Sequence, residues 1–139
     1  DHRDLHSFPT RRSSDLLKAK HLKKALEGLA EEGVTQLFRP VIGADFIVGA
    51  VGQLQFEVMA DRLANEYQLE VIFEASPYAE ARWLSGDKAD VEDFANKHKG
   101  AMASDIDDQP VFLAKSAWEI GYVGERFSKI GFERSKERA

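Results

Sequence analysis

Basic and aromatic side chains are the residues of this chain whose types could do chemistry on another molecule. The candidates are four arginines, one lysine and one tryptophan: Arg39, Arg62, Arg82, Arg126, Lys115 and Trp83. Guanidinium and ammonium groups bind backbone phosphates, and an indole can stack on an unpaired base. These residues are therefore candidates for contact with backbone phosphates or for stacking, although a solvated or salt-bridged charge is the commoner role of any single one. Asp61 directly precedes Arg62 and could pair with it.

Motifs for catalysis, cofactor binding and metal binding are incomplete. The segment Gly49-Ala-Val-Gly52 lacks the lysine of a phosphate-binding loop, so its glycines favour a tight turn, although amides at a helix start could hold an anion. The four histidines are scattered, and the run that begins at Asp105 has Pro110 where a calcium loop needs glycine. There is no cysteine and no serine placed with a histidine and a carboxylate. We predict no catalytic residue, no cofactor site and no metal site in this chain.

Composition limits the class of protein. The chain has 139 residues, 43% hydrophobic and 31% charged, which suits one domain with a modest core. Its net charge of -5 argues against binding nucleic acid through bulk charge alone. The absence of cysteine permits a reducing cytoplasm, and no apolar run is long enough to predict a membrane span.

The N-terminal segment differs from the rest of the chain. Residues 1–15 have no hydrophobic period and several turn formers, and they look like translated adapter sequence. We therefore predict a disordered, foreign leader over residues 1–15 and one α/β domain over residues 16–139.

Hydrophobic periodicity predicts alternating helices and strands after Leu16. The predicted elements are a helix ending at Gly33, a strand over 34–39, a strand over 46–51 that is buried on both faces, a helix ending near Tyr67, a half-solvated strand over 69–75, a strand over 79–84, a helix capped by Asp87 and ending near Gly100, a strand over 111–115, and a last helix opened by the capping box Ser116-x-x-Glu119. On that helix Trp118 is expected in the core with Tyr122 and Phe127, and Gly121 and Gly124 weaken it. No internal repeat is visible.

This order of elements predicts an α+β fold. Helices on one face of a mainly antiparallel sheet form a two-layer α/β sandwich, and a strand–helix unit followed by a half-exposed strand is typical of the ferredoxin-like arrangement.

Several short stretches also resemble the third, C-terminal domain of translational GTPases, most closely that of the bacterial peptide chain release factor 3 family, which are class II release factors. The matching stretches are 17–26, 31–33, Leu37-Phe-Arg-Pro40, Ile47-Val-Gly-Ala-Val-Gly52, Leu54-Gln-Phe56, 62–63, 66–67, Ala81-Arg-Trp83 and Gly124-Glu-Arg-Phe127. In that family the domain opens with a strand inside the sheet, and the leader stands in its place here. The resemblance therefore implies that the first strand is missing and that the isolated chain is marginally stable or prone to associate.

The resemblance implies a cytoplasmic role in translation termination. Such factors use GTP on the ribosome to release class I release factors. GTP and magnesium would bind in an N-terminal GTPase domain absent here, so this fragment would not itself be an enzyme. Its partners would be small-subunit rRNA, a small-subunit protein, its own GTPase and second domains and, indirectly, class I release factors, without a membrane. Charge reversal at Arg39, Arg62, Arg82 and Arg126 in the whole factor should then slow factor recycling.

Two other functions stay open from the residues alone. One is a regulatory ferredoxin-like module that binds a small molecule, which calorimetry against amino acids or nucleotides would detect. The other is a third-domain fragment of an elongation-factor-type GTPase.

Overall fold

Strands and helices alternate along the described part of the chain, which covers residues 4–8, 16–33, 35–42, 46–50, 53–71 and 74–134 of a computed structural model. The elements in chain order are β1 (Asp4–Phe8), α1 (Leu16–Glu31), β2 (Gln36–Pro40), β3 (Phe46–Ala50), α2 (Gln53–Tyr67), β4 (Glu74–Ala75), β5 (Glu80–Ser85), α3 (Lys88–Lys97), the short 3-10 helix η2 (Lys99–Ala101), β6 (Met102–Ser104), β7 (Pro110–Ala114), α4 (Ala117–Arg126) and β8 (Gly131–Glu133). The described strands form one 8-stranded sheet in the order β4-β1-β3-β2-β6-β7-β5-β8, in which all neighbours are antiparallel.

The first half of the sheet, β1 to β4 with α1 and α2, is called the first unit below. Its strand order β4-β1-β3-β2 and its β-α-β-β-α-β sequence are those of a ferredoxin-like fold. The helix α1 forms because Ala25, Leu26 and Leu29 recur on one face, and all three are buried. It ends at Gly33, whose φ of +83° is readily adopted only by glycine. The α+β, two-layer, ferredoxin-like prediction is confirmed.

The second half, β5 to β8 with α3, η2 and α4, is called the second unit and repeats the same topology. Its chain order is again β-α-β-β-α-β, and its strands lie in the equivalent order β8-β5-β7-β6. The two units join at β2 and β6, where Arg39 pairs with Ser104 and Pro40 with Ala103. The sequence shows no internal repeat, but the two units share the same order of elements and of strands.

Strand β1 corrects the prediction for the N-terminal segment. Asp4–Phe8 pairs with Phe46–Ala50 of β3 on one side and with β4 on the other. The expectation of disorder over residues 1–15 is wrong for these five residues, and so is the expectation that the first strand is missing. Five residues are too few to show a hydrophobic period, so neighbouring strands rather than local pattern place this segment. Residues 1–3 and 9–15 lie outside the described residues.

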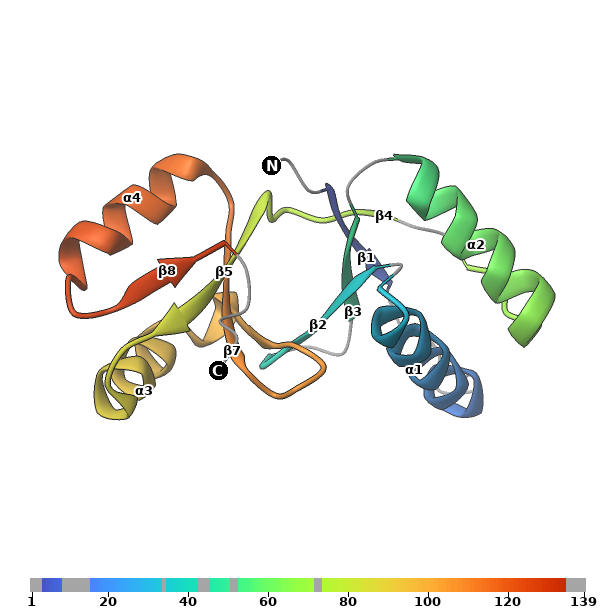
Figure 1. Cartoon of the computed structure of the whole chain (residues 1–139), viewed down its shortest axis with the longest axis horizontal. Coiled ribbons are helices and arrows are strands. Elements are labelled where there is room, and N and C mark those ends of the chain that lie inside the picture. The colour runs from blue at the N-terminus through green and yellow to red at the C-terminus, as the bar shows by residue number, and fades with distance from the viewer. Residues whose placement is uncertain are drawn as a thin grey trace.

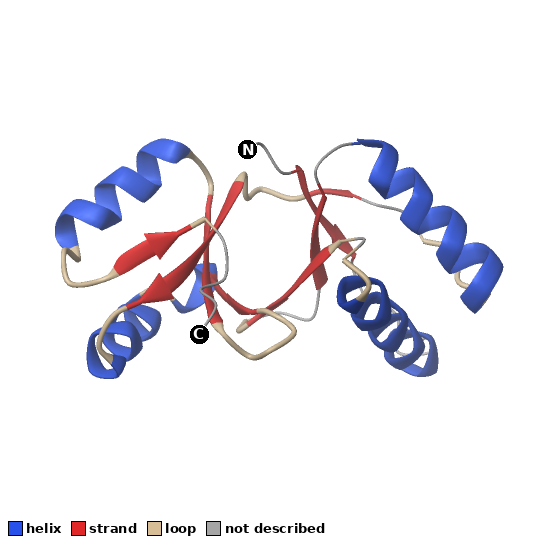
Figure 2. Cartoon of the chain, viewed as in Figure 1, coloured by secondary structure: helices blue, strands red, loops and turns tan. Residues whose placement is uncertain are grey.

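The helices cover one face of the curled sheet, and the opposite faces of the two units meet each other (Figures 1 and 2). One cluster packs α1 and α2 on the first unit, and another packs α3 and α4 on the second unit. A third cluster lies between the units and unites Phe38 and Ile47 with Trp83, Val111 and Leu113. Because Val48 faces the helices while Ile47 faces the second unit, β3 is buried on both faces, as its apolar run predicts.

Other differences concern short or edge elements. The sequence prediction omits β6 and β8, which have only three residues each. The predicted strand over 69–75 is restricted to Glu74–Ala75, residues 69–71 are not a strand, and residues 72–73 lie outside the described residues. Asp87 is the N-cap of α3, but its side chain makes no capping hydrogen bond.

Candidate nucleic-acid interface

The six predicted contact residues lie on four elements and one turn. Arg39 is on β2, Arg62 on α2, Arg82 and Trp83 on β5, Lys115 in the turn before α4, and Arg126 at the end of α4. They differ in exposure and in partners, so we consider them in turn.

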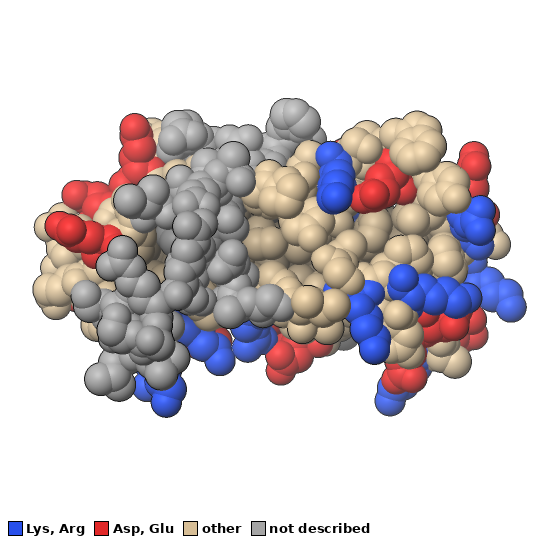
Figure 3. All heavy atoms as spheres, turned by 180° about the vertical axis from the view of Figure 1, so that it is seen from behind, with Lys and Arg blue, Asp and Glu red and all other residues tan. Residues whose placement is uncertain are grey.

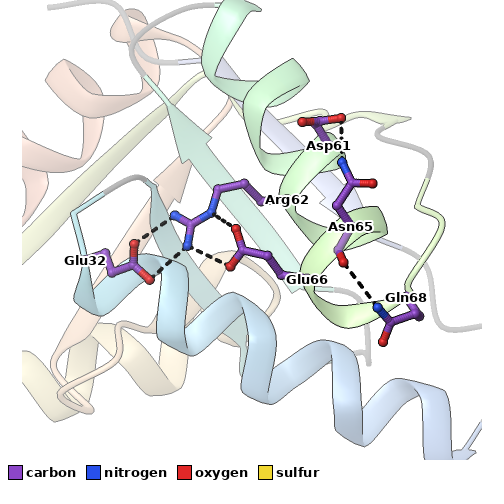
Figure 4. Close-up of polar contacts among 6 residues, drawn as sticks. All are labelled: Glu32, Asp61, Arg62, Asn65, Glu66 and Gln68. Carbon is purple, nitrogen blue, oxygen red and sulfur yellow. Dashed lines mark hydrogen bonds and ion pairs between the residues drawn. The ribbon is translucent and has the colours of Figure 1, made fainter.

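Arg62 is held between two glutamates (Figure 4). Its Nε and Nη2 donate to Glu66 at 2.7 and 3.0 Å, while Nη1 and Nη2 donate to Glu32, beyond the end of α1, at 2.8 and 3.2 Å. These hydrogen bonds hold the pKa of the Glu32 and Glu66 carboxyls below the ordinary value of 4.5, and they raise the pKa of Arg62. Asp61 instead accepts a hydrogen bond from Asn65, so the suggested pairing of Arg62 with Asp61 is wrong.

Arg39 is bound to the acidic loop after β6. Its Nη2 donates to the backbone carbonyl of Asp105 at 2.8 Å and to Oδ1 of Asp108 at 2.7 Å, and its Nη1 lies 3.7 Å from Oε2 of Glu27. The guanidinium of Arg39 therefore ties the first unit to a loop of the second unit.

Arg82 and Trp83 are buried in the second unit. Arg82 is 9% exposed and donates from Nη2 to Oε1 of Glu80 at 2.9 Å. Trp83 is 6% exposed, packs edge-to-face on Phe38 with ring centroids 5.7 Å apart, and donates from Nε1 to Oδ2 of Asp105 at 2.9 Å. An indole enclosed in this way has no face open to a base.

Lys115 and Arg126 remain exposed, at opposite ends of α4. The Ser116 half of the predicted capping box is confirmed, since Ser116 Oγ accepts a hydrogen bond from the Glu119 amide. Glu119 Oε1 accepts a hydrogen bond from the amide of Lys115, one residue before the cap. The capping box fixes where α4 begins, but it leaves both basic side chains in solvent.

Trp118 is a surface residue that the sequence prediction assigns wrongly to the core. It is 74% exposed and stacks on Tyr122, with ring centroids 5.2 Å apart and an interplanar angle of 18°. The face of α4 that packs on the sheet carries Ile120, Val123 and Phe127. Plotting α4 at 3.6 residues per turn separates these two stripes, so the signal for an exposed Trp118 was present in the sequence.

The other motifs show no ligand chemistry in the structure. The Asp105 carboxylate accepts hydrogen bonds from Trp83 Nε1 and from the amides of Asp107 and Gln109, so it closes a turn. In the described part of the chain, no group of three or more His, Asp or Glu side chains could hold a metal ion. None of the described helices is both long and apolar enough to cross a membrane. Gly52 lies outside the described residues, so the expected turn there is not visible.

Charges of both signs are mixed on the described part of one face of the molecule. Figure 3 shows Lys and Arg side chains beside Asp and Glu over the visible face, in keeping with the net charge of -5. Short-range contacts at individual side chains therefore suit this surface better than attraction by one broad basic region.

Comparison with known protein families assigns the chain to one of them. The family described as class II release factor RF3, C-terminal domain, matches residues 6–124, from within β1 to within α4. This match covers most of the chain and both units, and the chain therefore belongs to the family of class II release factor RF3 C-terminal domains.

Proposed function

We propose that this chain is the ribosome-contacting domain of a GTP-dependent class II release factor that promotes dissociation of class I release factors. In this proposal it binds small-subunit rRNA and a small-subunit protein, while GTP and magnesium bind in a separate GTPase domain of the factor. The domain itself carries no catalytic residue and transmits a change of orientation to the ribosome.

The family match over residues 6–124 is the observation that carries the proposal. The construction of the domain also supports a mechanical role. The cluster around Phe38 and Trp83 is shared by the two units, and Arg39 binds the loop at Asp105 across them. Such a body can move as one piece and pass a force between its ends.

The ion pairs of the basic residues indicate which of these residues are available to bind RNA. Arg39, Arg62 and Arg82 already bind carboxylates, so an RNA phosphate would have to compete with those ion pairs. Lys115 and Arg126 form no ion pair within the part of the chain that the structure describes. We therefore expect Lys115 and Arg126 to contribute more to RNA contact than the other three cations.

The test is factor recycling by the full-length protein on post-termination ribosomes with GTP. Charge reversal by Lys115→Glu together with Arg126→Glu should slow dissociation of the class I release factor roughly tenfold, the effect of about 1.4 kcal/mol. A matched control is Lys88→Glu with Lys99→Glu, which reverses two other exposed charges and should leave the rate within about twofold.

The recycling assay also tests the assignment as a whole. A full-length factor without residues 6–134 should still hydrolyse GTP but should no longer release the class I factor. Normal release by that deletion variant would show that this domain is not needed for recycling.

A further inference from the structure

The solvent face of α4 carries three stacked side chains at four-residue spacing, called the α4 stack below: Trp118, Tyr122 and Arg126. The two rings are offset-parallel, with centroids 5.2 Å apart, and Cζ of Arg126 lies 5.3 Å from the centroid of Tyr122. Trp118 is 74% exposed. Tyr122 covers one face of the indole, and among the described residues no other ring stacks on it, so the stack ends in an indole face open to solvent.

The charge near the α4 stack differs from that of the whole chain. Lys115 precedes Trp118, Arg126 forms the other end of the stack, and Lys129 follows the helix; all three are exposed. The acidic groups of α4 are Glu119, which is engaged in the helix cap, and Glu125, which is exposed. Residues 115–129 thus carry three cations and two acids, a net charge of +1, whereas the chain as a whole carries -5.

The extent of the exposed apolar surface indicates the kind of occupant. In the second unit Trp118 and Tyr122 are the exposed large hydrophobic residues among those described, and Val41, Ile42, Leu54 and Val58 lie in the first unit. A stable protein interface buries about 800 Å² on each partner around an apolar centre. Two rings flanked by cations offer too small an apolar surface for a stable protein interface. A single planar base needs no more than one open ring and nearby positive charge.

We propose that an unpaired RNA base stacks on the open face of Trp118 and extends the α4 stack, while Lys115 and Arg126 contact the adjoining phosphates. This inference rests on the proposed function, because it states which part of the domain meets RNA and by what chemistry. It differs from the contact predicted from sequence, in which Trp83 was the stacking residue; Trp83 is buried and Trp118 is not.

The first test is a fluorescence titration of the whole chain with a single-stranded oligoadenylate of about eight nucleotides at low salt. Stacking should quench the fluorescence of Trp118 until the site is saturated with RNA. The fluorescence of Trp83 should stay constant because Trp83 is buried. The variant Trp118→Leu, followed by fluorescence anisotropy of labelled RNA, should bind about tenfold or more weakly. Trp118→Phe keeps a flat ring and should bind within about threefold of the original chain. A duplex of equal length should bind less tightly, because its bases are already stacked on each other.

Matched controls separate stacking from general effects. Leu54→Ala removes a comparably exposed apolar side chain from the first unit and should leave RNA binding unchanged. Circular dichroism and thermal melting should show that Trp118→Leu is folded, as expected for a residue that is 74% exposed. Equal affinity of Trp118→Leu and the original chain, or no binding of oligoadenylate by the original chain, overturns the proposal.

Cosedimentation with isolated small ribosomal subunits distinguishes this failure from failure of the proposed function. If the original chain pellets with the subunits and Trp118→Leu pellets equally, the base-stacking proposal fails while ribosome contact stands. If the original chain does not pellet, ribosome contact fails, and the oligoadenylate titration still judges the stacking site by itself. Binding to isolated small-subunit proteins that is lost in Trp118→Leu would instead show that the α4 stack takes a protein partner and would overturn the RNA assignment.

Discussion

Asp105 accepts hydrogen bonds from side chains of both units at their junction. Its carboxylate accepts from Trp83 Nε1 and from two backbone amides, and its carbonyl accepts from Arg39. The side chain is 6% exposed, so water cannot replace these partners. A buried carboxylate with several donors holds a turn and an indole in one arrangement.

Asp105→Ala should lower the free energy of unfolding by about 2–4 kcal/mol, because it leaves one indole and two amide donors without an acceptor. Urea denaturation measures the change. Asp93→Ala is the matched control, since Asp93 is exposed and, among the described residues, pairs with Lys97 at 3.1 Å on the same helix. It should change stability by no more than about 0.5 kcal/mol, and an equal effect of the two substitutions would contradict the role of Asp105.

The pair of glutamates around Arg62 makes stability depend on pH. The pKa values of Glu32 and Glu66 are lowered in the folded chain, so their ionised forms stabilise it above the ordinary value of 4.5. This contribution to stability is lost as the pH falls from about 4.5 through the lowered pKa values of the two glutamates. The loss of stability in Arg62→Gln should therefore be larger at about pH 7 than at about pH 3. Urea midpoints of both proteins at the two pH values test this, and a constant difference would refute it.

At the scale of elements, α4 places two different stripes on its two faces. Val123 packs into the second unit, whereas Gly121 and Gly124 meet no atom within 4 Å of an added Cβ. A glycine inside a helix lowers the stability of the helix. At these two positions no close packing that requires a glycine compensates for that loss. The capping box at Ser116 and the apolar stripe offset that weakness, so the helix forms as predicted.

Two glycine substitutions separate helix propensity from backbone conformation. Gly121→Ala should raise the free energy of unfolding by about 0.5–1 kcal/mol, because alanine favours the helix and has room for its Cβ. Gly86→Ala should lower it by about 1–3 kcal/mol, because Gly86 has a φ of +129° and its added Cβ would lie 2.8 Å from the Lys129 carbonyl oxygen. Thermal melts of the two variants should move in opposite directions.

At the scale of the whole molecule, β1 completes the first unit. It lies between β3 and β4, so the unpaired strand edge expected from sequence is filled, and that reason for expecting association no longer holds. The family match also begins inside β1, at residue 6.

Ser7→Pro should therefore lower the free energy of unfolding by about 3 kcal/mol or more, because proline removes a donor from a strand with neighbours on both sides. Ser7→Thr keeps the donor and should retain stability. Calorimetry of the original chain should show one transition, since the cluster between the units contains side chains from both. An unchanged melt of Ser7→Pro would show that β1 contributes little to the fold.

The sequence alone determined the elements with a strong local signal. The stripe of α1, the buried run of β3, the cap of α4 and the α+β class all follow from periodicity and capping, because these depend on residues within a turn or two of each other. The family also follows from short stretches of the sequence, and the match over residues 6–124 confirms it.

Only the tertiary structure decided what depends on distant partners. Short strands such as β1, β6 and β8 are stabilised by neighbours far along the chain, and the repeat of two units becomes visible only from their pairing. The same holds for the basic residues. Arg39 meets Asp108 69 residues away, and Arg62 meets Glu32 30 residues away in addition to Glu66 on its own helix. Trp83 and Trp118 exchange their expected roles because the sheet closes over one and leaves the other in solvent. Exposure and the long-range ion pairs are properties of the packed chain, since each is set by groups that local sequence does not bring together.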